Sequence, residues 1–108
     1  MQRVRLMRLI VFFDLPNDTY KQKKSYRLFR KYLLKNGYLM MQESVYSKLV
    51  INSRIADGLI AQLHSNKPPE GLVQVLKITE KQYETIEFIA GGPASREELE
   101  DTDSLIVL

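Results

Sequence analysis

The sequence predicts a small α+β fold in which two helices cover one face of a sheet. Three observations support this prediction. Several short stretches are apolar or alternate between apolar and polar residues, as strands do, and two longer stretches repeat apolar residues at helical spacing. Stretches with the strand pattern and stretches with the helix pattern follow one another along the chain. The length of 108 residues is typical of a single domain.

The first strand and the first helix are expected over residues 6–14 and 19–36. The strand is apolar almost throughout and stops at Asp14, where Pro and Asx residues favour a turn. Thr19 and Gln22 have capping-box spacing at the start of the helix, and a glycine follows its last residue. A central strand therefore leads into a helix with clear ends.

The middle of the chain is expected to hold a strand, a helix and a further strand. Residues 38–51 alternate roughly between apolar and polar side chains, which we interpret as one long strand with a bulge near residues 42–43. Residues 53–65 repeat apolar side chains at helical spacing until a Lys-Pro-Pro-Glu-Gly segment breaks the pattern. Residues 72–79 alternate cleanly and are expected to form the next strand.

The last part of the chain predicts a fourth strand at 85–89 and a detached apolar strand at 104–108. The order β-α-β-α-β-β, with an extra C-terminal strand, is typical of a ferredoxin-like sandwich. We expect a ferredoxin-like domain over residues 1–92, followed over residues 93–108 by an acidic linker and the last strand. That strand is too short to be stable alone and needs a sheet edge.

Several function classes are excluded by composition. The sequence contains no cysteine and one histidine, His64. Disulfides, thiolate nucleophiles, Cys-ligated zinc and multi-histidine metal sites are therefore ruled out. No apolar run approaches the ~20 residues that span a bilayer, and the N-terminal segment has no signal-peptide pattern. We expect a cytoplasmic protein without a membrane partner.

Positive charge is concentrated in the first third of the chain. Residues 1–36 hold ten of the sixteen Lys and Arg residues and two acids, a net charge of about +8, which leaves about −5 for the rest. A basic segment of this kind indicates a polyanionic partner. The acids concentrate at residues 97–103, which we interpret as a solvated linker or, alternatively, as a segment that docks on a basic partner.

The first predicted helix separates apolar and basic side chains. Tyr26, Phe29 and Leu33 fall on one side, where core packing is a better interpretation than base stacking. The opposite side carries a basic stripe, with two further cations at its margin: Lys24, Arg27, Lys31 and Lys35, then Lys23 and Arg30. A charged helix face is usually only solvated, but such a face mixes both signs of charge and this one has almost no acids. We predict that the stripe binds the DNA backbone independently of sequence.

Asp14 is the candidate metal ligand because a carboxylate that follows an apolar strand stands at a sheet edge. Mg²⁺ needs about six oxygen ligands, so one Asp14 is too few, but two copies in a two-fold dimer supply a pair of carboxylates. The structural alternative is that Asp14 only caps the turn before the helix. Ser44 and Tyr46 are candidate polar residues of a dimer cleft, although strand hydroxyls more often face solvent or bond to neighbours.

Five segments, in this order and at these separations, resemble the CRISPR-associated protein two family, and especially its members from single-effector (type II) systems. The segments are RLIVFFDLPNDT, KKSYRLFRKYLLKNGY, QESVYSKLV, NKPPEG and LKITEKQYETI. The resemblance implies a ferredoxin-like homodimer that joins the CRISPR integrase in a heterohexamer. It also implies that Asp14 occupies the family's metal-binding position and that the C-terminal strand pairs with the sheet edge of the partner subunit.

Two hypotheses of function follow. In the favoured one, the dimer bridges two integrase dimers during spacer acquisition and its basic helices hold double-stranded DNA. In the alternative, the dimer is a Mg²⁺-dependent endonuclease that cleaves RNA or DNA with paired Asp14 residues. A third class, a small regulatory dimer that binds a metabolite, lacks a glycine-rich phosphate cradle in the sequence.

Overall fold

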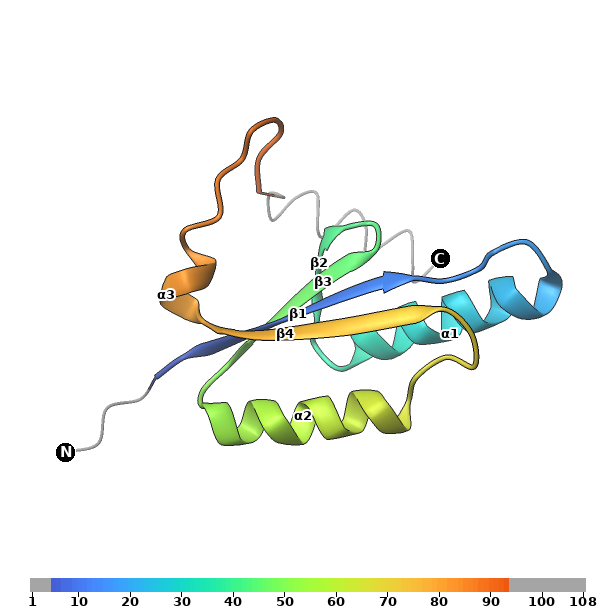
Figure 1. Cartoon of the computed structure of the whole chain (residues 1–108), viewed down its shortest axis with the longest axis horizontal. Helices are drawn as coiled ribbons and strands as arrows, with labels where there is room; N and C mark the ends of the chain where they lie inside the picture. Colours follow the sequence, from blue (N-terminus) through green and yellow to red (C-terminus); the bar gives the residue numbers. More distant parts are fainter. Residues whose placement is uncertain (1–4, 94–108) are drawn as a thin grey trace.

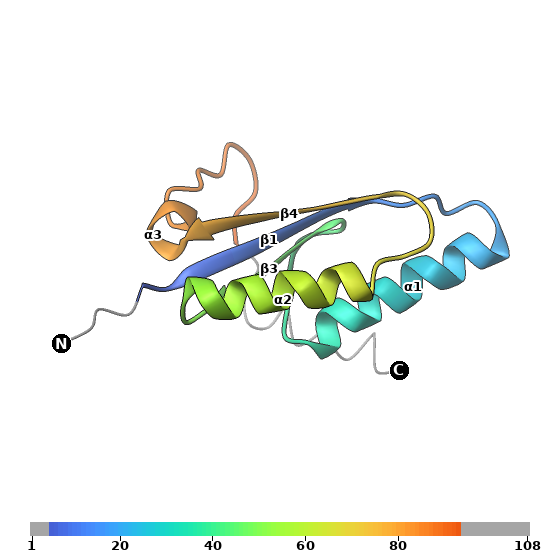
Figure 2. The same ribbon diagram turned by 60° about the horizontal axis from the view of Figure 1, so that its bottom comes forward.

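The structure, a computed structural model, describes residues 5–93, and these residues form one antiparallel sheet and three helices. The strands lie in the order β2-β3-β1-β4, which puts β1 inside the sheet as predicted. Helices α1 and α2 lie on the same face of the sheet, and α3 lies near the start of β1 (Figures 1 and 2). This is the ferredoxin-like α+β fold that the sequence predicts. In chain order the elements are β1 (Met7–Asp14), α1 (Tyr20–Lys35), β2 (Leu39–Gln42), β3 (Val45–Val50), α2 (Ser53–Ser65), β4 (Leu72–Thr79) and α3 (Glu80–Tyr83).

Local sequence signals set the ends of α1 as predicted. The Thr19 side chain accepts a hydrogen bond from the backbone N–H of Gln22, and the Gln22 side chain accepts one from the backbone N–H of Thr19. These bonds satisfy backbone donors that the first turn leaves free. At the other end, Gly37 has a φ of 85°, a left-handed conformation that glycine adopts without steric cost.

Residues 38–51 form a hairpin, so the prediction of one long strand was wrong. Strands β2 and β3 are joined by a turn at Glu43 and Ser44, and their register shifts between Met40 and Gln42. A two-residue turn alone shifts the alternation by one residue, since the paired Gln42 and Val45 are three positions apart. The register shift before Gln42 adds one residue and cancels this, so the paired Met40 and Tyr46, six positions apart, face the same side. The alternating pattern therefore continues through the turn and resembles a single strand.

The strand predicted at residues 85–89 is also absent from the described structure. A second capping box, Thr79 with Gln82, ends β4 and starts α3. The backbone N–H groups of Thr85 and Ile86 then donate to carbonyls of α3. These donors are used in turns, so they cannot form a ladder with a neighbouring strand.

The core lies between the sheet and the two long helices. It is built from alternate residues of β1, from β3 and from the inner faces of α1 and α2, and its buried members are Met7, Leu9, Val11, Phe13, Phe29, Leu33, Tyr38, Tyr46, Val50, Ala56 and Leu63. The other alternate residues of β1, together with their partners across β3 and β4, point to the opposite face. We call this second face the open face.

The predicted acidic linker and C-terminal strand lie outside the described residues, so they stay predictions. Within residues 5–93, every helix is too short or too polar to cross a membrane.

Candidate nucleic-acid interface and candidate metal site

The basic stripe of α1 is exposed as predicted. Lys24, Arg27, Lys31 and Lys35 are all exposed, while Phe29 on the opposite side of the helix is buried. Successive members of the stripe are separated by a rise of about 4.5 to 6 Å along the helix axis. The two ion pairs that occur within residues 5–93 lie elsewhere and involve no cation of α1. The stripe is therefore a concentrated positive surface that the described acids do not neutralise.

The two cations at the margin of the stripe, Lys23 and Arg30, differ in their exposure. Lys23 is exposed, whereas Arg30 is half-buried. The Arg30 Nε–H donates a hydrogen bond of 2.8 Å to the hydroxyl of Tyr46. Arg30 is thus connected to the protein interior as well as to the basic surface.

Tyr46 lies in the core and not on the open face. Its side chain is fully buried, and its ring stacks on Phe13 with centroids 5.6 Å apart. Burial raises the pKa of Tyr46, and the hydrogen bond and charge of Arg30 lower it in part. The predicted position of Tyr46 in a dimer cleft was therefore wrong, because the alternation of β3 directs this side chain toward the helices.

Asp14 is exposed at the last position of β1, on the open face. It lies two residues after Phe12 on the same side of the strand and is paired with Leu72 of β4. A Cβ added at Gly71 would lie 2.8 Å from the Asp14 carbonyl oxygen, so a glycine is needed for this close approach. No cluster of three or more metal-ligating residues occurs in residues 5–93. Asp14 fits the role of an oxygen ligand, but one described chain supplies only this one carboxylate.

Ser44 lies at the same end of the sheet as Asp14. It is in the turn between β2 and β3, and its carbonyl accepts a hydrogen bond of 3.0 Å from the backbone N–H of Phe13. This bond continues the pairing of β1 and β3 up to the residue before Asp14. A role for the Ser44 side chain in a dimer cleft stays a prediction.

The open face exposes large apolar side chains from all four strands. Five of them are more than one-third exposed, and they are Phe12, Leu39, Leu49, Leu72 and Leu76.

Arg8, at the other end of β1, contacts α3. Its Nε–H donates a hydrogen bond of 2.9 Å to the Glu80 carboxylate, and a second guanidinium nitrogen pairs with the same carboxylate. The central carbon of the guanidinium lies 4.1 Å from the centroid of the Tyr83 ring. We did not predict this contact from the sequence, because 72 residues separate Arg8 and Glu80.

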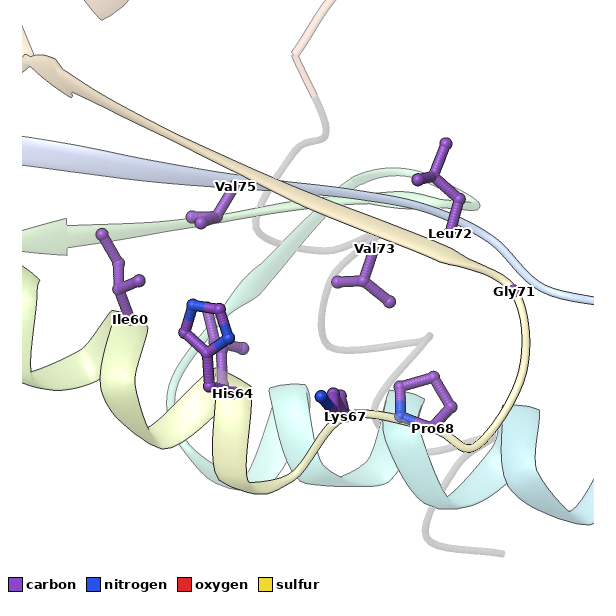
Figure 3. A pocket seen from close by; sticks show the side chains of 9 residues that line it. Ile60, His64, Lys67, Pro68, Gly71, Leu72, Val73 and Val75 are labelled. Carbon is purple, nitrogen blue, oxygen red and sulfur yellow. The ribbon is translucent and has the colours of Figure 1, made fainter.

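A groove of about 320 Å³ runs between α2 and β4, shown in Figure 3. Val73 and Val75 point from β4 toward α2, whereas Leu72 points to the other side of the strand (Figure 3). The lining that residues 5–93 supply is mostly apolar, and its titratable side chains are those of His64 and Lys67. Because none of the described residues that line this groove supplies a carboxylate or a second histidine, the groove does not resemble an acid–base or metal site.

Comparison with known proteins gives the family. The family model described as CRISPR associated protein Cas2 matches residues 7–86, from the start of β1 to just past α3. The chain belongs to the Cas2 family. The predicted family is therefore confirmed, and the matched region includes both Asp14 and the whole of α1.

Individual Cas2 relatives are similar over most of the chain. A protein of Treponema denticola is 51% identical over 102 residues, which are 94% of this chain and 99% of the relative. A Streptococcus mutans protein is 45% identical over 79% of this chain and 78% of its own length. A third, from Acidovorax ebreus, is 40% identical over 84% of this chain and 89% of its own length. All three relatives are named CRISPR-associated endoribonuclease Cas2.

Proposed function

We propose that this Cas2 chain forms a homodimer that binds double-stranded DNA and bridges two integrase dimers during CRISPR spacer acquisition. The basic stripe of α1 carries the proposal. Lys24, Arg27, Lys31 and Lys35 are exposed and form no ion pair within residues 5–93. Contacts of this kind neutralise phosphates, so they hold a duplex without selecting its sequence.

The open face supports the dimer. A chain of this size rarely exposes a row of large apolar side chains unless a partner covers them. Two copies packed through their open faces would bury residues such as Leu76 and leave each α1 on the outside of the dimer. The integrase as bridging partner, and a role for acidic residues 97–103 in docking it, rest on the family resemblance.

The position of Asp14 favours a second candidate function, a Mg²⁺-dependent endonuclease. Asp14 lies on the open face, so a two-fold axis close to the end of β1 would bring two copies of its carboxylate together. These two carboxylates and water would hold Mg²⁺, which supplies charge stabilisation and an activated water to phosphodiester hydrolysis. The names of the relatives fit this alternative too.

Spacer acquisition in cells tests both functions. One strain carries Asp14→Ala, and a second carries Lys24, Arg27, Lys31 and Lys35 all changed to Gln. The bridging function predicts normal acquisition in the first strain and loss in the second. A control strain with Arg54, Lys67 and Lys81 changed to Gln removes exposed charges outside α1 and should acquire spacers normally.

Duplex binding by the purified proteins gives an independent measurement. In a plot of the logarithm of affinity against the logarithm of salt concentration, each neutralised phosphate contributes about 0.9 to the steepness of the slope. The slope of the α1 variant should therefore be shallower by about 3 to 4 per protomer. The Arg54, Lys67 and Lys81 variant should keep the wild-type slope. Loss of acquisition with Asp14→Ala and normal acquisition with the α1 variant would refute the bridging function.

A further inference from the structure

Arg30 is the cation of α1 whose guanidinium is held by the protein core. The exposed lysines of the stripe have long flexible side chains, which lose rotamer freedom when they bind a phosphate. The Arg30 Nε–H instead donates a hydrogen bond of 2.8 Å to the Tyr46 hydroxyl. The orientation of the guanidinium is therefore fixed before any ligand arrives.

Tyr46 is a rigid acceptor for this bond. It is fully buried, it lies in β3 opposite Val11 of the central strand, and its ring stacks on Phe13. Phe13 in turn packs edge-on against Phe29 of α1, with centroids 5.3 Å apart. The hydroxyl is thus placed by the sheet and by the helix that carries Arg30.

The bond uses one of the five N–H donors of the guanidinium. No other hydrogen bond or ion pair of the Arg30 side chain occurs within residues 5–93. Its four remaining donors are on the two Nη atoms, which lie on the far side of the guanidinium from the side-chain stem. This arrangement leaves free the edge that binds two phosphate oxygens in a bidentate manner.

Arg30 also lies in line with two exposed cations. Lys23, Arg27 and Arg30 are separated by four and three positions, so they follow one row along the helix surface. A phosphate bound by Arg30 would therefore be adjacent to one bound by Arg27. The half-buried position of Arg30 places it at the border between this row and the core.

We propose that Tyr46 is a positioning residue that holds Arg30 as a preorganised contact for a phosphate of the DNA backbone. The inference rests on the proposed DNA-binding function and adds that the core of the sheet sets the geometry of one contact. Ordering a free side chain on binding costs affinity, and the Tyr46 bond removes that cost in advance.

Duplex binding by Tyr46→Phe tests the inference, because this change removes only the hydroxyl and keeps every charge. We expect affinity to fall about 2- to 10-fold with an unchanged salt slope. Arg30→Gln should also weaken binding, but with a slope lower by about 1 per protomer. Combining the two changes should give no further loss beyond Arg30→Gln, since both act through one contact.

Tyr26→Phe is the matched control. Tyr26 also packs on Phe13, with centroids 5.9 Å apart, and its hydroxyl makes no hydrogen bond within residues 5–93. This variant should bind DNA as the wild type does. Arg30→Lys is a second test that leaves Tyr46 intact: it keeps the charge but loses the planar fork, so affinity should fall with the slope unchanged.

Three results would overturn the inference. They are wild-type binding by Tyr46→Phe, wild-type binding by Arg30→Gln, and independent losses that add in the double variant. Failure of the DNA-binding function itself is recognised separately, because wild type and every variant would then bind duplex weakly and with equal salt dependence.

Discussion

Two tyrosine hydroxyls lie in the layer between the sheet and the helices, and they are satisfied differently. The Tyr46 hydroxyl accepts a bond from Arg30, whereas the Tyr38 hydroxyl is buried without a hydrogen-bond partner in the described residues. Burial, with a smaller effect of Tyr32, raises the pKa of Tyr38 from its ordinary value of 10.0 to about 12. Desolvation has this effect because it disfavours the phenolate.

The raised pKa predicts a loss of stability at alkaline pH. Between pH 10 and about 12, Tyr38 ionises in the unfolded chain but not in the folded protein, so the unfolded state binds fewer protons and the free energy of unfolding falls as pH rises. In this window the free energy of unfolding of the wild type should fall, relative to that of Tyr38→Phe, by up to about 1.4 kcal/mol per pH unit. Urea unfolding at pH 8, 10 and 11 measures the difference.

At pH 8, Tyr38→Phe should be about as stable as the wild type, because the hydroxyl that it removes has no partner in the described structure. Tyr20→Phe is the control, since Tyr20 is 77% exposed. The free energy of unfolding of Tyr20→Phe should fall above pH 10 by as much as that of the wild type. A parallel decline of wild type and Tyr38→Phe above pH 10 would contradict the prediction.

Helix α1 and its stripe were predictable because their signals are local. The capping box, the final glycine and the separation of basic from apolar residues all lie within 19 consecutive positions, Thr19 to Gly37. Helix α2 and strand β4 begin and end at the predicted residues for the same reason. The contact surfaces of a helix follow directly from its periodicity, so the exposure of Arg27 and Lys31 could be inferred without knowing the fold.

The hairpin and the environment of Arg30 could not be inferred in this way. The register shift in β2 cancels the change of alternation that the two-residue turn introduces, so the sequence alternates similarly before and after Glu43 and Ser44. The bond from Arg30 to Tyr46 depends on which face of β3 is covered by α1, and that is decided by the complete sheet. The position of Asp14 at the end of a strand was predicted, but its place on the open face required the pairing with Leu72.

Helix α3 is predicted to depend on Arg8. The Arg8 and Glu80 side chains are 12% and 19% exposed, and Tyr83 stacks on the guanidinium. α3 has only four residues and no buried side chain, and besides this contact the backbone N–H of Glu80 donates to the carbonyl of Leu6, just before β1. We expect Arg8→Met to raise local opening of α3 about 10-fold, which corresponds to about 1.4 kcal/mol.

Hydrogen exchange of the Thr85 and Ile86 amides measures this opening, since both donate to carbonyls of α3. Exchange of the Leu33 amide in α1 should stay unchanged. Lys77→Met is the control, because it removes the more exposed ion pair, which joins β4 to Asp57 of α2 and involves no residue of α3. Unchanged exchange of Thr85 and Ile86 in Arg8→Met would show that Arg8 does not hold α3.

At the scale of the whole molecule, the two faces of the sheet have different surroundings. One face is covered by α1 and α2, while the open face exposes apolar side chains next to Asp14. The proposed DNA surface and the proposed metal ligand therefore lie on opposite sides of the sheet. Dimerisation through the open face would bring the two Asp14 carboxylates into one interface and keep both basic helices accessible.

Leu76→Lys tests this arrangement, because it places a charge at the centre of the open face, where Leu76 is 47% exposed. Burying an unpaired charge in an interface is costly, so the variant should be monomeric at concentrations where the wild type is a dimer of about 25 kDa, twice 12.6 kDa. Light scattering coupled to size-exclusion chromatography measures the mass. Leu28→Lys is the matched control, since Leu28 is 56% exposed on α1 and should leave the dimer intact.

The monomer has a further consequence that separates DNA binding from bridging. Leu76→Lys keeps every cation of α1, so each chain should still bind duplex, but with about half the salt slope of the dimer because only one stripe is present. Spacer acquisition should be lost, since a monomer cannot join two integrase dimers. A dimeric mass for Leu76→Lys would refute the open face as the interface, and acquisition by a proven monomer would refute the bridging function.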